Sequence, residues 1–421
     1  MGLGVVGGGV ATALLEHPED IFSKTGKSIH LKRILVRDMS KPRDVSIPAD
    51  IITSNPEDIL EDPTIQIVVE VMGGSNPAKR LLAGCLSHGK HVVTANKEVM
   101  AKYGPELQAL ADTNKARLLY EASVCAAIPI INSLCDPLLA NQIQNIRGII
   151  NGTSNYILTD MAQHQADFDD ALKEAQELGY AEADPTNDVD GFDAVYKLSI
   201  LASLAFHYRV SPDDVYREGI RQLQAQDFQY ARELGYGIKS LAVADCKEGR
   251  IQARVYPALI PLDNMIAKVD GVYNAVEVSG DLCGSVMLHG MGAGREPTTS
   301  AVIGDLIQLS RQIAVGGVTP LKPSQDMGLE IKPIDELETR YYIRLIVTDT
   351  AGVLAQIAKI LGANQISIAS VLQKDTFPEE QKAELVITTH PSREASVQES
   401  LNEVANLEVV SEISNVIRIE E

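Results

Sequence analysis

Short apolar runs and amphipathic stretches alternate along the first part of the chain. Apolar runs of strand length lie at 31–38, 66–74 and 91–95, and a helical pattern at 77–89 separates the second run from the third. The run at 66–74 ends in two glycines and is typical of a parallel strand that is buried on both faces. A further strand is expected at 116–124. This alternation predicts a doubly wound parallel sheet, whose ligands bind at the carboxyl ends of the strands.

A second architecture begins near residue 131, where the alternation ends. Long helical patterns come first, and strand patterns then lie at 251–260, 274–280 and 283–290. We expect an α+β domain here, with one face of its sheet available to a partner subunit. Three closely spaced glycines then lead into a helix that should return to the first domain: Gly290, Gly292 and Gly294.

A third pattern closes the chain. Segment 341–421 has the order strand, helix, strand, strand, helix, strand, which is the ferredoxin-like arrangement. A core of about 80 residues is marginal, so pairing with a second copy is expected. The predicted fold class is α/β with a Rossmann-type doubly wound parallel sheet, an α+β domain and a ferredoxin-like domain. The expected limits are 1–130 with about 297–318 for a dinucleotide-binding domain, 131–296 for a substrate and dimerisation domain, 319–340 for a linker and 341–421 for the last domain.

Composition and charge exclude several classes of protein. Of the 421 residues, 45% are hydrophobic, so the chain can bury a full core and is not disordered. The net charge of −20 argues against nucleic acid and against an anionic membrane as partners. Five cysteines without paired spacing favour reduced thiols and no zinc site. Because no signal peptide and no apolar run of about 18 residues is present, a cytoplasmic protein is expected.

The chain opens with three glycines in GxGxxG spacing: Gly2, Gly4 and Gly7. Such glycines permit a tight turn and let a pyrophosphate approach the backbone at a helix N-terminus. The strand that should precede this turn is missing, because only Met1 stands before it. Either that strand is truncated or the true start lies upstream.

Residues near the end of the predicted strand 31–38 bear on the choice of nucleotide. Arg37 and Lys41 favour the 2′-phosphate of NADP, whereas Asp38 would suit the ribose hydroxyls of NAD. Their distance from the glycines exceeds the usual spacing of about 20 residues, which predicts an insertion around 17–30. The residues therefore leave NAD and NADP open.

A loop within 179–197 concentrates acidic side chains without a Lys or Arg among them: Glu182, Asp184, Asp188, Asp190 and Asp193. Asp190 is predicted to cap a helix and Asp193 to lie at its N3 position, with Lys197 one turn later. That spacing alone is explained by helix stabilisation of about 0.2–0.5 kcal/mol. Helix stabilisation does not explain the crowding of acids. That crowding predicts a site for the ammonium group of an amino acid, beside a proton-donating Lys197.

Two further clusters are candidates for the site. Lys97 follows the strand at 91–95, at the edge of the sheet where ligands bind, although a surface lysine that opens a helix is the alternative. Asn151, Thr153 and Ser154 lie where a strand meets the start of a helix. They either cap that helix or help its free amides to hold a carboxylate.

Together these features resemble the homoserine dehydrogenases that carry a C-terminal ACT domain. The resemblance runs from Gly2 to the last predicted strand, and its most specific segments are TANKEVM, YEASVCAAIPI, NGTSNYIL and GYAEADPTNDVDGFDAVYK. It implies the interconversion of L-homoserine and L-aspartate 4-semialdehyde with NAD or NADP, on the route to threonine, methionine and isoleucine. It also implies a homodimer or homotetramer, with threonine as an effector of the ACT domain.

The resemblance assigns roles by position. It implies that Lys197 is the proton donor and acceptor, and that Lys97 lies between nicotinamide and substrate. The expected substrate contacts are Glu182, Asp193, Asp188 and Thr153. The expected cofactor contacts are Gly2, Gly4, Val5, Val6, Gly7, Arg37, Lys41, Thr94, Lys97, Gly179 and Gly294. A sodium ion or another monovalent cation would be held, mainly through backbone carbonyls, by Glu121, Val124, Ala126 and Ile128. The effector would contact Asp349, Gly352 and Asn364.

Two other interpretations stay open at this point. Cys125 would be an acylating nucleophile in an aldehyde dehydrogenase, but its small apolar neighbours and the lack of a nearby His favour a buried structural thiol. Alternatively, the chain is an amino-acid sensor built on an inactive dehydrogenase. The intact lysines and acids of the predicted site argue against a sensor, and the missing first strand argues slightly for it.

Overall fold

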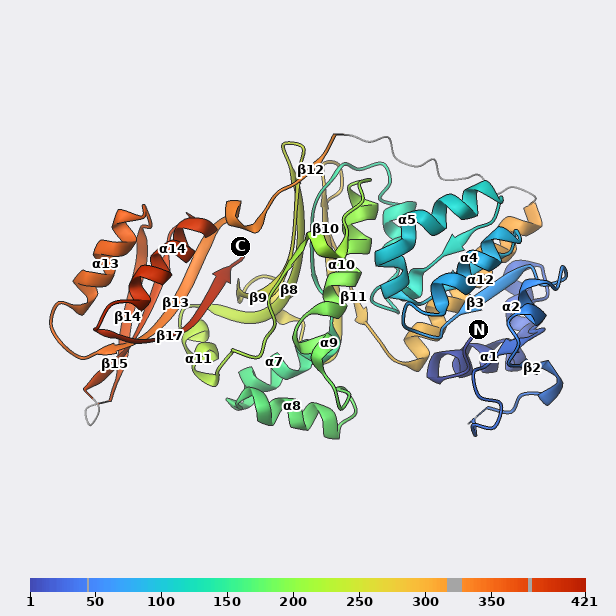
Figure 1. Cartoon of the computed structure of the whole chain (residues 1–421), viewed down its shortest axis with the longest axis horizontal. Coiled ribbons are helices and arrows are strands. Elements are labelled where there is room, and N and C mark those ends of the chain that lie inside the picture. The colour runs from blue at the N-terminus through green and yellow to red at the C-terminus, as the bar shows by residue number, and fades with distance from the viewer. Residues whose placement is uncertain (44, 316–327, 378–380) are drawn as a thin grey trace. The chain divides into compact units, whose positions relative to one another are not determined.

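The computed structural model describes residues 1–43, 45–315, 328–377 and 381–421 (Figure 1). The chain divides into two compact units. The first unit comprises 1–146, 196–214 and 274–329, and the second comprises 147–195, 215–273 and 330–421. Each unit is therefore built from segments that are far apart in the sequence. The predicted domain limits, which divide the chain by role, stay a prediction.

The first unit contains the predicted parallel sheet. Its three parallel strands are β3 (Ile67–Glu70), β4 (His91–Thr94) and β5 (Leu118–Leu119). A separate parallel pair consists of β1 (Ile34–Leu35) and β2 (Ile52–Thr53). The α/β class with parallel strands is confirmed. The strands are shorter than the predicted runs, since residues 31–33 precede β1 and residues 116–117 precede β5 without belonging to a strand.

The helices of this unit are α1 (Val5–Glu16), α2 (Pro18–Thr25), α3 (Glu57–Leu60), α4 (Ala78–Ser87), α5 (Lys97–Thr113), α6 (Ile130–Cys135) and α12 (Arg295–Val315). α12 packs against α1, since Val302, Leu306 and Leu309 share a buried core with Val10 and Leu14. The helix after the second glycine turn therefore returns to the first domain, as predicted. Three more strands are adjacent in the order β11 (Gly284–Met291), β10 (Tyr273–Gly280) and β6 (Ile143–Ile149).

Met1 and Gly2 lie between β1 and β3, in the position that the central strand of a doubly wound sheet takes. The Met1 amino group donates to the Val69 carbonyl at 2.6 Å, and the Met1 carbonyl accepts from Val71 N–H at 3.0 Å. On the other side, Gly2 N–H donates to the Leu35 carbonyl at 2.9 Å. These contacts continue the sheet for two residues, although no strand is assigned to them.

A cavity of about 840 Å³ adjoins Met1 and is lined mainly by residues 27–34 and 64–69. It thus lies between the segments that lead into β1 and β3, where a doubly wound sheet has a central strand. Burial lowers the pKa of the Met1 amino group, because the charged ammonium loses contact with water. The cavity thus adjoins the two residues that continue the sheet between β1 and β3.

Fusing an extended apolar segment of about five residues to Met1 should fill this cavity. The fusion would replace the buried ammonium by a neutral peptide group and pair the open edges beside it. We expect Tm to rise by about 2–4 °C, measured by scanning calorimetry. The control is a segment of equal length with two prolines, which cannot donate to the ladder. Equal Tm values for the two fusions would show that the cavity does not accept a strand.

The second unit is built on a long antiparallel hairpin. β8 (Tyr236–Lys247) and β9 (Arg250–Pro261) pair along their whole length. Two short strands pair with β9 in parallel: β7 (Val215–Arg217) and β12 (Glu330–Ile331). The sequence predicts β9 but not β8, because a run of small apolar residues fits a helix as well as a strand.

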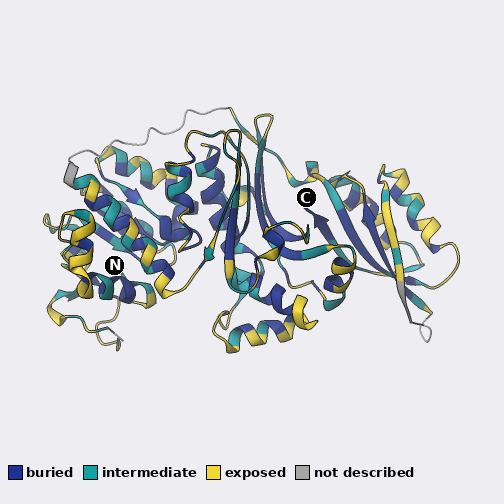
Figure 2. Ribbon diagram, turned by 180° about the vertical axis from the view of Figure 1, so that it is seen from behind, coloured by how far each residue is buried: buried dark blue, intermediate teal, exposed yellow. Residues whose placement is uncertain are grey.

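The helices of this unit are α7 (Gly152–His164), α8 (Phe168–Glu177), α9 (Thr186–Val189) and α11 (Ala225–Glu233). The acidic loop leads into α10 (Phe192–Ala205), whose residues from 196 onward belong to the first unit. Leu158 and Phe228 pack with Ile238 and Leu259 in one core. Most residues of β9 are buried, whereas α8 keeps one face exposed (Figure 2). The amphipathic helices thus turn their apolar faces to the hairpin.

The C-terminal segment has the predicted ferredoxin-like order. Its elements are β13 (Glu338–Thr348), α13 (Val353–Ala363), β14 (Ile368–Phe377), β15 (Lys382–Thr389), β16 (Ser392–Arg393), α14 (Glu394–Ala405) and β17 (Val410–Ile419). The main strands are antiparallel in the order β17-β13-β15-β14. β17 also pairs with β9, so the two sheets are continuous. Of the predicted linker, 319–327 lies outside the described residues, and 330–331 forms β12.

Candidate functional site

The glycine turn at the N-terminus has the geometry of a nucleotide-binding turn. Gly2 has φ of +94°, and a Cβ there would lie 2.9 Å from the Val71 carbonyl oxygen. A Cβ on Gly7 would lie 2.3 Å from the Gly2 carbonyl oxygen. Gly4 caps α1 without a side chain, and the first turn of α1, which begins with Val5 and Val6, carries no acid. The backbone amides at this helix start therefore fit a pyrophosphate.

The region after β1 offers positive charge for a nucleotide. Arg37 and Lys41 are exposed. The Asp38 carboxylate accepts from the backbone and the hydroxyl of Ser40 at 2.8 and 2.7 Å, and this bonding lowers the pKa of Asp38. Arg43 donates to the Asp38 carbonyl. The Asp38 carboxylate is thus hydrogen-bonded within its own loop, whereas Arg37 and Lys41 are exposed to solvent.

Lys97 is the first residue of α5, directly after the carboxyl end of β4, as the sequence predicts. The preceding Asn96 caps this helix by accepting from Val99 N–H and donates to the Gly74 carbonyl at 2.8 Å. Thr94 is fully buried, and its hydroxyl donates to Glu70 at 2.7 Å. The Thr94 hydroxyl is therefore hydrogen-bonded inside the sheet, so a cofactor would contact only the backbone of this residue.

The predicted cation ligands form one buried turn. Glu121, Val124, Ala126 and Ile128 are each at most 4% exposed. Ala126 has φ of +30°, and Cys125 next to it has φ of +52°, both in the left-handed region. Such a backbone is strained in residues other than glycine and persists where its surroundings fix it. A buried turn of carbonyl oxygens fits a monovalent cation, which prefers oxygen ligands.

Two buried acids, Glu121 and Asp305, lie at this turn. The Glu121 carboxylate accepts from the N–H groups of Ile131 and Asn132 at 2.9 and 2.7 Å, and burial raises its pKa. Asp305 accepts from Glu121 N–H at 3.0 Å, and burial raises the pKa of Asp305 to about 7. The thiol of Cys125 is buried and accepts from the Asn274 amide at 3.5 Å. The predicted buried thiol is thereby observed.

The acidic loop folds differently from the prediction at one point. α9 spans Thr186–Val189, and α10 begins only at Phe192. The prediction that Asp190 caps the second helix is wrong: Asp190 ends α9, and Gly191 with φ of +82° stands between the helices. Asp193 accordingly lies at the second position of α10, one residue earlier than predicted.

One asparagine joins two of the predicted substrate acids. The Asn151 amide nitrogen donates to Asp188 at 2.7 Å and to Asp193 at 2.9 Å. Its oxygen accepts from Ser154 N–H at 2.8 Å, which caps α7. The cap was expected from the sequence, but the link between the acids was not. The structure therefore brings Asp188 and Asp193 together through Asn151.

The other predicted residues of this unit are more exposed. Glu182 is exposed, and its carbonyl accepts from the Gln176 side chain at 3.0 Å. The Thr153 hydroxyl donates to the Tyr180 carbonyl at 2.7 Å. Gly179 follows α8 with φ of +77°, which is the usual role of a glycine after a helix. Gly294, in the first unit, precedes α12 with φ of +117°.

Lys197 is buried, with 7% of the residue exposed, and Asp193 is 3% exposed. Both lie on α10, where residues four apart share a face. A lysine that points into bulk solvent would have excluded a catalytic role. Lys197 does not point into bulk solvent, and its role in proton exchange stays a prediction.

The predicted effector residues lie at the two ends of α13. Asp349 and Gly352 are exposed in the turn before this helix, and Gly352 caps it with φ of +96°. Asn364 caps the other end, about 16 Å away along the axis. Its amide donates to Glu403 at 3.1 Å. The structure therefore does not bring all three residues together within one chain.

Three family profiles match the chain. The profile described as homoserine dehydrogenase matches residues 129–307, and that described as homoserine dehydrogenase, NAD binding domain, matches 2–121. The ACT domain profile matches 341–409. The homoserine dehydrogenase of Synechocystis sp. is 44% identical over 428 residues, which cover 100% of this chain and 98% of that protein. The chain belongs to the homoserine dehydrogenase family.

Solved structures of homoserine dehydrogenases share this fold. The enzyme from Thiobacillus denitrificans is 42% identical with a TM-score of 0.93, and the match covers 100% of this chain and 97% of that one. A hyperthermophilic archaeal homoserine dehydrogenase in complex with NADPH is 28% identical with a TM-score of 0.59, over 76% of this chain and 98% of that one. The resemblance seen in the sequence is confirmed. As a member of the homoserine dehydrogenase family, the chain is an oxidoreductase with an NAD-binding domain and an ACT domain.

The described residues also bear on membrane spans and on metal sites built from side chains. Within them, no helix has the length and apolar character needed to span a bilayer. The same residues contain no group of three or more His, Cys, Asp or Glu side chains that could hold a metal ion.

Replacing Asn151 tests how the acids of this homoserine dehydrogenase family member are held. Asp caps a helix as well as Asn does, so Asn151→Asp keeps the cap but exchanges the shared donor for a third carboxylate. We expect a loss of about 1–3 kcal/mol in the free energy of unfolding at pH 7, measured by urea denaturation. The loss should shrink toward pH 4, where carboxylates take up protons. A loss that is equal at both pH values would contradict the repulsion argument.

Proposed function

We propose that this protein transfers hydride reversibly between L-homoserine and NADP or NAD, giving L-aspartate 4-semialdehyde. The observation that carries the proposal is the pair of buried residues on α10, Asp193 and Lys197. A carboxylate and an amine withdrawn from water, one helical turn apart, supply an anchor for the substrate ammonium and a proton carrier for its hydroxyl. The full-length match to curated homoserine dehydrogenases supports the same substrate.

In the proposed reaction, Lys197 moves the proton at the reacting oxygen. Neutral Lys197 takes the proton of the homoserine hydroxyl as carbon 4 is oxidised, and protonated Lys197 returns it to the alkoxide in the reverse direction. Lys97 adds positive charge beside that oxygen and stabilises it as charge develops. The nicotinamide would supply the hydride-accepting carbon when the pyrophosphate of the dinucleotide is bound at the glycine turn.

The acids of the loop would bind the substrate ammonium. Glu182, Asp188 and Asp193 are the proposed contacts, with Thr153 beside them on the first turn of α7. The Asn151 amide fixes the spacing of Asp188 and Asp193. A fixed pair of carboxylates loses little entropy on binding and therefore favours a cationic group.

NADP is the proposed nucleotide. Arg37 and Lys41 are exposed beside β1, whereas the Asp38 carboxylate already accepts two hydrogen bonds from Ser40. Arginine binds phosphate oxygens through two N–H groups, which suits a 2′-phosphate. The archaeal relative in complex with NADPH supports this choice.

The remaining roles follow from the family. We propose that the carbonyls of Glu121, Val124, Ala126 and Ile128 hold a sodium ion or another monovalent cation. We also propose that threonine regulates the enzyme at the ACT domain, within threonine, methionine and isoleucine biosynthesis in the cytoplasm, and that the protein is a homodimer or homotetramer. The support for an effector is the ACT match, and its identity as threonine comes from the pathway.

Lys197→Ala should lower kcat for homoserine oxidation by about 10²–10⁴-fold, the usual effect of losing a general acid or base. The assay is the increase in absorbance near 340 nm with homoserine and NADP at alkaline pH. The homoserine KM should change much less, because the proton acts mainly in the transition state. Lys173→Ala, at an exposed lysine of α8, is the control and should match the wild type. Near-normal turnover of Lys197→Ala would remove the proposed role.

Arg37→Ala should raise the KM for NADP by about tenfold and leave the KM for NAD within about twofold. The reason is that the 2′-phosphate, the group that distinguishes the two nucleotides, loses a positively charged partner. Initial rates at saturating homoserine give both constants. Arg33→Ala is a matched control, because Arg33 donates to the Asp50 carbonyl at the other end of β1. Equal changes for NADP and NAD would contradict the assignment.

A further inference from the structure

A short segment of the second unit contacts both the acidic loop and the ACT domain. We call residues 216–222 the bridge segment. It includes the last two residues of β7 and the turn that follows, and Glu218 N–H donates to the Val255 carbonyl of β9 at 2.8 Å. The bridge segment is thus fixed to the central hairpin and presents one side to the loop and the other to β17.

Three hydrogen bonds join the bridge segment to the acidic loop. Ile220 N–H donates to the Val189 carbonyl at 2.9 Å, and the Arg217 guanidinium donates to the Asp190 carbonyl. The Arg221 Nε donates to the Asp190 carboxylate at 2.5 Å. All three acceptors lie at the end of α9, between the candidate substrate acids at 188 and 193.

The bridge segment and the acidic loop approach each other closely at Gly219. A Cβ at this position would lie 2.7 Å from the Val189 carbonyl oxygen and 2.9 Å from the Asp190 Cα. Distances below 3.0 Å force one of the two segments to move. Only glycine therefore allows this contact, and the position of the loop depends on the position of the bridge segment.

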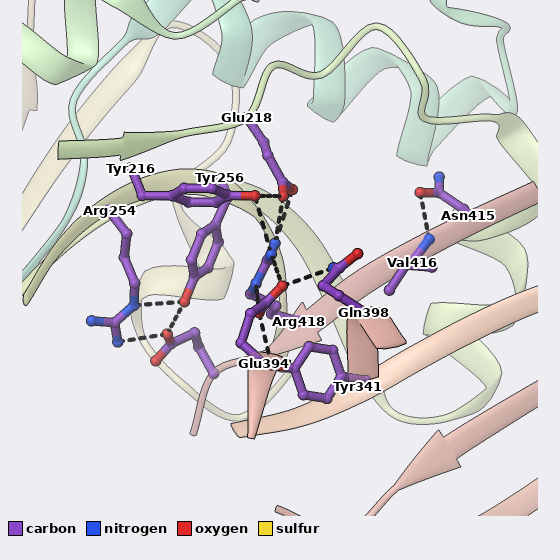
Figure 3. A network of polar contacts seen from close by, with 11 residues as sticks. Tyr216, Glu218, Arg254, Tyr256, Tyr341, Glu394, Gln398, Asn415, Val416 and Arg418 are labelled. Atoms are coloured by element: carbon purple, nitrogen blue, oxygen red, sulfur yellow. Dashed lines mark hydrogen bonds and ion pairs between the residues drawn. The ribbon is translucent and has the colours of Figure 1, made fainter. Parts of the chain in front are cut away.

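The ACT domain holds the other side of the bridge segment. Arg418 of β17 donates through Nη1 to both carboxylate oxygens of Glu218, each at 2.9 Å. Arg418 also donates to Glu394 of α14 at 2.7 and 2.8 Å (Figure 3). Asn415 of the same strand donates to the Gln222 carbonyl at 3.3 Å. The guanidinium of Arg418, with the residue 2% exposed, is therefore shared between the ACT domain and the bridge segment.

We propose that Arg217 and Arg221 are positioning residues for the substrate acids, and that the pair of Glu218 and Arg418 makes this positioning depend on the ACT domain. The inference rests on the proposed function, because it takes Asp188 and Asp193 as substrate contacts. Arg217 and Arg221 both bind Asp190, and Asp190 lies between Asp188 and Asp193 in the sequence. The two arginines thereby fix the end of α9 and the start of α10. A displaced loop would weaken homoserine binding without touching the nucleotide turn.

Arg221→Met tests the clamp on the loop, because it removes the charge but keeps the aliphatic part of the side chain. We expect the homoserine KM to rise about tenfold, with kcat and the nucleotide KM within about twofold. Arg221→Lys keeps the charge and should recover part of the loss. Arg232→Met, at an exposed arginine of α11, is the matched control and should behave as the wild type.

Glu218→Gln and Gly219→Ala test the two sides of the bridge segment separately. Glu218→Gln removes the charge that pairs with Arg418 and also alters the acceptor of the Tyr216 hydroxyl. Gly219→Ala displaces the loop without changing any charge. Both should raise the homoserine KM selectively, and the double variant Glu218→Gln/Arg221→Met should show less than the product of the single effects, because both act through one segment.

The outcomes separate this inference from the proposed function. An active wild type in which Arg221→Met keeps its homoserine KM, or loses kcat and nucleotide binding equally, overturns the positioning role. An unchanged homoserine KM in Glu218→Gln overturns the dependence on the ACT domain. A wild type that does not reduce NADP or NAD with homoserine overturns the proposed function, and this inference falls with it.

Discussion

The second unit depends on holding several carboxylates of one loop close together. Like charges repel strongly where water is excluded, so such a loop needs donors and cations at fixed positions. The Asn151 amide supplies the donor between Asp188 and Asp193, and two arginines supply the cations at Asp190. Because Asn151 also caps α7, the same contact sets the start of a helix and the spacing of the acids. Local stability and candidate chemistry are thus supported by one side chain.

The same balance of charges recurs where the ACT domain meets the hairpin. Each of three buried arginines lies between two acids: Arg254 with Asp245 and Glu420, Arg344 with Asp227 and Glu384, and Arg418 with Glu218 and Glu394. Burial alone would lower the pKa of each guanidinium, but the neighbouring acids and tyrosines together outweigh burial and raise that pKa, so all three stay charged. Buried ion pairs of this kind add less to stability than to the choice of one arrangement, since a misplaced partner leaves a charge unpaired.

Local features of the sequence predicted much of the fold. The glycine turn, the parallel strands and the ferredoxin-like order follow from glycine spacing and hydrophobic periodicity, which act over a few residues. Contacts between distant residues could not be predicted in this way. Aspartate is a common helix-capping residue, so the sequence predicted Asp190 as a cap. Its carboxylate is instead bound by Arg221, 31 positions later. Asn151 could be predicted as a cap, whereas its bonds to acids 37 and 42 positions away leave no local pattern.

The pairing of β17 with β9 limits how this enzyme family member can be rearranged. Arg418 lies opposite Ala258 and Ile419 opposite Leu259, and Glu420 N–H donates to the Leu259 carbonyl at 2.9 Å. An ACT domain joined only by a linker could be lost or exchanged by simple gene fusion. Here its removal would uncover a strand edge that invites aggregation. Shuffling of this domain during evolution would therefore require a substitute strand, because β17 belongs to the sheet of the hairpin as well as to the C-terminal ferredoxin-like segment.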